Sequence, residues 1–196
     1  MSRSVPALLL LTACSSTPSY LNRDIVTVGV LPPFNDSMTV DAPKKVWPMV
    51  DEETAARGYR TVPRERIEEF FRRNQFVFPE EIRQYDPKDL AKEWGCQGLV
   101  YSRLEEYGQK YAVLSREVRV RIRVELLDCR TGEVLWRGVG EAGDSSAAGN
   151  GIGLGTLLVQ AMVSEALASE VESYARKACA RAFRALPLAG FAPSPK

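Results

Sequence analysis

The segment between Val118 and Leu126 restricts the fold of this 196-residue chain more than any other part of the sequence. Apolar and charged residues alternate through it with a period of two. The apolar positions are Val118, Val120, Ile122, Val124 and Leu126. The intervening positions are Arg119, Arg121, Arg123 and Glu125. Because successive side chains of a strand point to opposite faces, this pattern predicts a β-strand with one buried face and one face in water.

Further strands are predicted on both sides of this one in the sequence. We place the central strand at residues 111–128, preceded by a strand at 97–107 and followed, after Arg130-Thr131-Gly132, by one at 133–141. Short connections between such strands predict an antiparallel meander. Residues 24–31 form an apolar, β-branched run that ends at Pro32-Pro33, which predicts a buried strand, and residues 59–62 predict a short one.

Helical patterns occupy most of the remaining chain. We expect helices at 48–57, 63–74, 86–95 and 154–186, with Asp86 as the N-cap of the third. Residues 34–43 and the glycine-rich 143–155 are expected to be loops, and 187–196 a disordered tail. The predicted fold class is therefore α/β (α+β): a mixed sheet with an N-terminal parallel part and a C-terminal antiparallel meander, packed by helices that include a long C-terminal one. Residues 24–186 form a single domain.

The N-terminus has the layout of a secretory signal. Arg3 precedes an apolar stretch that is too short to span a bilayer, and Leu11-Thr12-Ala13-Cys14 resembles the lipobox of bacterial lipoproteins. By this resemblance residues 1–13 are a signal peptide, Cys14 carries the lipid, palmitate included, and residues 14–23 are the tether. Several acyl chains on one terminus anchor stably. Ser15, by the same resemblance, points to the outer membrane. The alternative is a core strand, or a plain signal peptide with an unmodified cysteine.

The composition argues against catalysis and against nucleic acid. The chain has no histidine, which is the usual acid–base residue near neutral pH and the commonest metal ligand. Its net charge of +1 gives no long-range attraction for nucleic acid. The carboxylates Glu80, Glu81, Glu105 and Glu106 lie in what look like solvated clusters. We therefore expect no enzyme, no cofactor and no metal site.

Three cysteines follow Cys14, and none has metal-ligand spacing: Cys96, Cys129 and Cys179. We interpret them as small buried side chains. A disulfide between Cys96 and Cys129 in an oxidising periplasm is an alternative that the sequence leaves open.

Two other motifs could be ligand sites, but their details favour a structural interpretation. The run from Gly149 to Gly155 lies between a strand and a helix, but its glycines do not fit the dinucleotide or phosphate-loop spacing, so we expect a flexible hinge or a loop that orders on a partner. The arginine row of the central strand predicts a solvated face with cross-strand ion pairs. An acidic partner or lipid head group on that row is the alternative.

The order of the motifs resembles one known family. After the lipobox come the strand ending in Pro32-Pro33 with Asn35 and Ser37 behind it, then Ala42-Pro43, Gly58-Tyr59, Glu106-Tyr107-Gly108, and finally the stretch from Leu127 to Gly138. This series resembles the outer-membrane lipoprotein family of unknown function that is typified by a neisserial surface antigen. The resemblance implies a fold like the N-terminal domain of TolB and the CsgG-type lipoproteins, and it implies no catalytic residues.

The functional hypothesis is a membrane-anchored periplasmic lipoprotein that acts as a structural or adaptor component in envelope assembly or secretion. Its expected partners are the membrane, through the lipid, and other envelope proteins, with a homodimer as one option. An accessory subunit of a CsgG-type secretion complex is the second hypothesis. An enzyme of unknown class is the third and is disfavoured.

Overall fold

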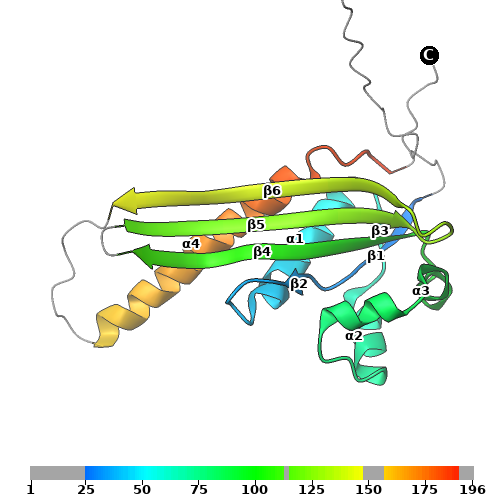
Figure 1. Ribbon diagram of the computed structural model, residues 1–196, viewed down its shortest axis with the longest axis horizontal. Helices are drawn as coiled ribbons and strands as arrows, with labels where there is room; N and C mark the ends of the chain where they lie inside the picture. The colour runs from blue at the N-terminus through cyan, green and yellow to red at the C-terminus, as the bar shows by residue number, and fades with distance from the viewer. Residues whose placement is uncertain (1–24, 113–114, 148–156, 190–196) are drawn as a thin grey trace, which may run out of the picture.

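The computed structural model describes residues 25–112, 115–147 and 157–189, which form one mixed sheet with helices on it (Figure 1). The strand order is β3-β1-β4-β5-β6, and β2 also pairs with β4. The strands are β1 (Thr27–Val30), β2 (Phe34–Asn35), β3 (Arg60–Thr61), β4 (Gly98–Ala112), β5 (Ser115–Asp128) and β6 (Val134–Ala147). The helices are α1 (Ala42–Ala56), α2 (Arg64–Arg73), α3 (Pro87–Trp94) and α4 (Leu157–Phe183), with a 3-10 helix η1 (Pro79–Gln84).

The sheet has a parallel part and an antiparallel part, as the sequence predicts. Strand β1 runs parallel to both β3 and β4, and β2 runs parallel to β4 further along. Strands β4, β5 and β6 form the antiparallel meander. The predicted fold class is confirmed.

The predicted facing of β5 is also confirmed. The five apolar residues of its alternating run, from Val118 to Leu126, are at most 4% exposed, with Ile122 and Val124 at 0%. Strand β4 supplies the neighbours on that face, since Leu104 pairs with Ile122 and Ser102 pairs with Val124. The two neighbouring strands and the helices behind them thus remove the whole apolar side of β5 from water, which is the main stabilising contribution of such a strand.

Helices α1 and α4 cover that apolar face (Figure 1). Trp136 of β6 contacts Phe183 of α4, with ring centroids 5.8 Å apart. The indole Nε1 of Trp47 in α1 donates a hydrogen bond of 2.9 Å to the carbonyl of Val30. Among the described residues, the opposite face is covered at its parallel end, where Trp94 of α3 lies against the β1–β4 pair beside Gly29. Most of the other face of the meander therefore stays in water.

Two glycines of β6 allow α4 to lie very close to the sheet. A methyl group on Gly140 would lie 1.8 Å from the carbonyl oxygen of Ala178, and one on Gly138 would lie 2.2 Å from that of Ala182. Both oxygens belong to the helix backbone, which cannot move aside as a flexible side chain could. The separation of helix and sheet here is thus set by the absence of a side chain at these two positions.

The prediction for residues 34–57 is wrong in two respects. The expected loop at 34–43 contains strand β2, and α1 begins at Ala42 rather than at Pro48. Pro43 occupies the first turn of the helix, where a missing N–H is harmless, whereas Pro48 lies inside the helix. The turn before Pro48 is held by packing of Val46 and Trp47, which are both buried. Tertiary packing thus overrides the local signal of the second proline.

Other element boundaries differ by a few residues. Strands β4 and β6 continue to Ala112 and Ala147, past the predicted ends at 107 and 141, so the expected loop at 143–155 is partly strand. The helices at 64–73 and 87–94 match their predictions, and the side chain of Asp86 accepts from the N–H of Lys88 as expected of an N-cap. The amide of Ala189 donates to the carbonyl of Arg57, so residues just after Leu186 lie against the end of α1.

The two faces of β5 should respond differently to substitution. Ile122→Asp places an unpaired charge at a fully buried position, and we expect it to lower the free energy of unfolding by more than about 4 kcal/mol. Arg121→Ala should lower it by less than about 1 kcal/mol, since its ion pairs are half exposed. Urea denaturation followed by circular dichroism measures both, and similar losses in the two variants would contradict the assigned facing.

A methyl group at Gly140 should separate α4 from β6. We expect Gly140→Ala to lower the free energy of unfolding by about 3 kcal/mol, at the upper end of the usual range for overpacking. Val139→Ala is the matched control, because Val139 immediately precedes Gly140 in β6 and is 49% exposed. Thermal denaturation of the two variants should give a large loss for the first and a small one for the second. Equal stability of Gly140→Ala and wild type would show that the helix is not held this closely.

Candidate functional site

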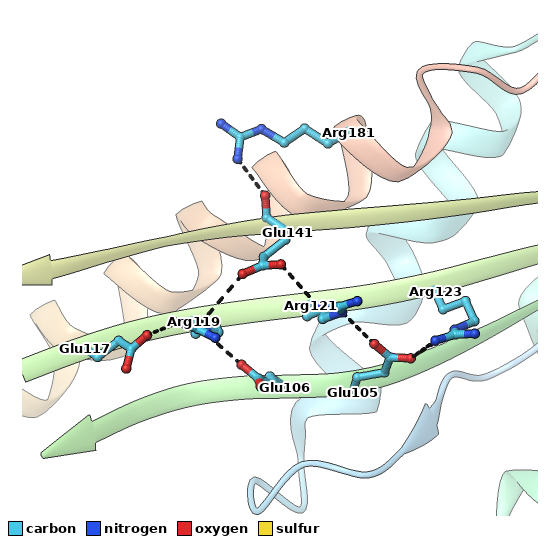
Figure 2. Close-up of polar contacts among 8 residues, drawn as sticks. All are labelled: Glu105, Glu106, Glu117, Arg119, Arg121, Arg123, Glu141 and Arg181. Carbon is cyan, nitrogen blue, oxygen red and sulfur yellow. Dashed lines mark hydrogen bonds and ion pairs between the residues drawn. The ribbon is translucent and has the colours of Figure 1, made fainter.

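The open face of the meander carries a row of alternating charges (Figure 2). The carboxylate of Glu105 on β4 bridges two arginines of β5, at 2.7 Å from Nε of Arg121 and 2.6 Å from Nη2 of Arg123. Glu141 on β6 contacts the same row from the other side, 3.4 Å from Nη1 of Arg121. Arg119 pairs with Glu106, at 3.5 Å, and with Glu117. The predicted cross-strand ion pairs are therefore confirmed.

These ion pairs leave the arginine row with little capacity for an acidic ligand. Each of the three arginines already donates to at least one carboxylate of the same sheet. The hydrogen bond to Glu117 is the main reason that the pKa of Arg119 is raised above its usual value. Because the arginines are paired with glutamates of the same sheet, this face is well solvated by water. Exposed ion pairs of this kind contribute little to the free energy of unfolding. This face consequently does not stand out as a binding site.

A groove of about 1160 Å³ lies elsewhere, between the start of α1, helix α2 and the segment that leads into η1. Its lining is mostly apolar and includes Trp47, Phe71, Val77 and Phe78. Val40 lines it from the loop before α1, and Met38 lies two residues earlier on the same loop. Four large apolar side chains at or beside this groove face water: Met38 is 98% exposed, Val40 91%, Val77 77% and Phe78 65%. Such a cluster usually marks a surface that binds something.

The segment that carries Val77 and Phe78 is held firmly. The carboxylate of Glu81 accepts hydrogen bonds from the amides of both residues, at 2.8 and 2.7 Å. The preceding residue, Phe76, turns inward and meets the ring of Phe70 edge-on, with centroids 6.1 Å apart. The two apolar side chains are thus presented to solvent by a fixed backbone.

The loop that carries Met38 and Val40 is held in a similar way. The side chain of Asn35 accepts from the hydroxyl and the amide of Ser37, and its amide group donates to the carbonyl of Thr39 at 3.0 Å. The hydroxyl of Thr39 donates to the carbonyl of Tyr107 at 3.1 Å, which ties the loop to β4. Asn35 and Ser37, which carried part of the family resemblance, are therefore the residues that shape one wall of the groove.

Sequence reasoning did not find this groove. Its walls come from residues 32–47, 64–71 and 77–81, which meet only in the folded chain. The one available signal was that Met38, Val40, Val77 and Phe78 are large apolar residues in segments without a helical or strand period. Such isolated residues are common on protein surfaces, and only their convergence makes them informative.

The residues singled out in the sequence are placed as follows. Cys14 and the run from Gly149 to Gly155 lie outside the described residues. Cys96, Cys129 and Cys179 are all buried and carry free thiols. Burial raises the pKa of Cys179 to about 12, so this thiol stays protonated at neutral pH. The interpretation of the three cysteines as buried side chains is confirmed.

Within the described ranges, no group of three or more histidine, cysteine, aspartate or glutamate side chains is placed to hold a metal ion. None of the helices in the part of the chain that the structure covers is long and apolar enough to cross a membrane. The apolar groove, with large apolar side chains exposed at it, is the kind of surface that takes part in macromolecular contacts.

Comparison with known families gives the class a name. This chain belongs to the family described as "Putative lipoprotein GNA1162-like", whose model matches residues 19–191. It is therefore an envelope-type lipoprotein, and the resemblance seen in the sequence is confirmed. The family description assigns no catalytic activity.

Individual relatives agree with this assignment. The "Putative lipoprotein NMB1124/NMB1162" of Neisseria meningitidis serogroup B is 28% identical over 166 residues, which cover 81% of this chain and 77% of that protein. The crystal structure of lipoprotein GNA1162 from Neisseria meningitidis is similar with a TM-score of 0.56 and 23% identity, over 76% of this chain and 99% of that one. The second likeness shows that the two proteins share a fold.

Proposed function

We propose that this protein is a lipid-anchored lipoprotein of the outer membrane that binds another envelope protein through the apolar groove. It acts as a structural or adaptor component in envelope assembly or secretion. The observation that carries the proposal is the set of four exposed apolar side chains at the groove, on two loops held by internal hydrogen bonds. Burial of such side chains by a partner is favourable, and little loop entropy is lost because the loops are already ordered.

The rim of the groove suggests the chemistry of the partner. Lys44 and Arg64 contribute positive charge to the lining, while Glu68, Glu80 and Glu81 contribute negative charge. A mixed rim around an apolar floor fits a protein segment with large apolar side chains flanked by charges of both signs. It fits a lipid surface less well, because a uniformly basic rim would be expected for anionic head groups.

The anchor determines where such binding would occur. With lipid on Cys14, the tether at 14–23 reaches at most about 35 Å. This length keeps the domain close to the membrane surface. A partner would then be recruited to that surface, since tethering raises its local concentration there.

The anchor can be tested directly. We expect a mass spectrum of the mature protein from native membranes to begin at Cys14, with a diacylglycerol on sulfur and an acyl chain on nitrogen. Cys14→Ala should release the domain into the soluble fraction. An unmodified Cys14 in a protein that fractionates without the membrane would contradict the anchored location.

Binding through the groove can be tested by site-specific photocrosslinking in intact membranes. A photoreactive residue in place of Val77 should give a discrete adduct with one envelope protein. Met38→Asp and Val40→Asp, made separately in that background, should each reduce the adduct at least about tenfold, because a charge would have to be desolvated on binding.

Leu188→Asp is the matched control for that experiment. Leu188 is 52% exposed and lies outside the lining of the groove, so this substitution should leave the adduct unchanged. All three variants should melt like wild type, since their side chains are exposed. An adduct that resists both groove substitutions would show that the partner binds elsewhere.

A further inference from the structure

Two of the buried cysteines lie together at one end of the sheet. Cys96 follows α3 and precedes β4, and Cys129 follows β5 directly. The strand register places Cys129 opposite Gln97, the residue after Cys96, because Gly98 pairs with Asp128 and the amide of Cys129 donates a 2.9 Å hydrogen bond to the carbonyl of Gln97. Both side chains line the same small cavity at this end of the sheet. Residues close together on paired strands are spaced on the scale that a disulfide spans, which is about 4.4–6.8 Å between Cα atoms.

We infer that Cys96 and Cys129 are joined by a disulfide in the mature protein. The bond closes a ring that contains the whole β4–β5 hairpin, with the cross-link at its base. This inference rests on the proposed function in one respect, because an envelope location supplies the oxidising conditions in which such bonds persist.

The backbone holds both cysteines in place before any bond forms. The amide of Cys96 donates to the carbonyl of Ala91, and Gly95 ends α3 in a left-handed conformation with φ of 66°. Cys129 lies in a turn fixed by Asp128, whose carboxylate accepts from the amide of Arg130 at 2.7 Å. Because both segments are ordered already, closing the bond removes little further freedom from the folded chain.

An oxidant can reach the pair. A cavity of about 340 Å³ opens beside the two thiols and is lined also by Lys88, Gln97 and Arg130. Cys96 is 6% exposed and Cys129 is 2% exposed, so Cys96 is the more accessible sulfur. Lys88 and Arg130 in the lining favour the thiolate form of a nearby cysteine, because positive charge stabilises a thiolate.

The order of attack follows from the difference between the two sulfurs. The hydrogen bond from Cys129 lowers the pKa of Cys96, whereas the same contact and burial raise the pKa of Cys129. The Cys96 thiolate attacks a disulfide of an envelope dithiol oxidase and releases one thiol. Cys129 then loses its proton and displaces the second thiol from the Cys96 sulfur. The pair gives up two protons and two electrons, and the oxidant disulfide becomes two thiols.

Cys179 provides an internal control. It is 1% exposed and lies on α4 beside a different cavity, at the contact with α1 near Glu53 and Arg176. With Cys14 modified by lipid and the pair oxidised, Cys179 is the thiol expected to remain free.

The test is differential thiol labelling of the wild-type protein taken from native membranes. Cells are quenched with acid, and the unfolded protein is alkylated, reduced and alkylated again with a heavier reagent. We expect Cys179 to carry the first label, and Cys96 and Cys129 to carry the second. Cys96→Ser should transfer Cys129 to the first label, whereas Cys179→Ser should leave the labelling of the pair unchanged.

A second arm separates the chemistry of the pair from the location of the protein. The purified, reduced protein is incubated with glutathione disulfide, which should remove two hydrogen atoms from its mass and raise its urea midpoint. Oxidation in both arms supports the disulfide. The disulfide is overturned if Cys96 and Cys129 from cells carry the first label and the purified protein also fails to oxidise with glutathione disulfide. If the pair oxidises in the tube but is reduced in cells, the mature protein does not contain the bond. That result points to a non-oxidising location and so contradicts the proposed envelope function, while the geometry of the pair stands.

Discussion

The structure depends on the burial of one face of β5. This strand lies between β4 and β6, which pair with it along most of its length. Helices α1 and α4 lie over one face of the meander (Figure 1), and the apolar residues from Val118 to Leu126 are buried. The long C-terminal helix can cover that face only because Gly138 and Gly140 let it approach β6. Two small residues on an edge strand thus determine how well the central strand is buried.

The opposite face of the same sheet solves a different problem. A long antiparallel sheet with one open face needs polar groups there, and an unbalanced row of arginines would repel itself. The glutamates of β4, β5 and β6 neutralise this row in place (Figure 2). The open face of the sheet is therefore stable in water without a partner, whereas the groove beside α1 and α2 leaves large apolar side chains exposed. This contrast between the two surfaces is the reason that we assign partner binding to the groove.

The groove and the thiol pair lie at opposite ends of the short parallel strands. Cys96 and Cys129 are at the end where β4 begins, near Ile25, while Pro32 and Asn35 line the groove beyond the end of β1. The described part of the chain begins with Ile25, at the first of these ends.

The sequence alone determined the mixed sheet, the facing of β5, the ion pairs of its outer face and the family, because each depends on short-range periodicity or on the order of local motifs. It misplaced the start of α1, since packing of Val46 and Trp47 tolerates Pro48 inside a helix. It left the pairing of Cys96 with Cys129 open and gave no sign of the groove. Only the tertiary structure brought these residues together, because the thiol pair, the groove and the close contact at Gly140 each join residues that are distant in the chain. Their distances are set by strand register and helix packing.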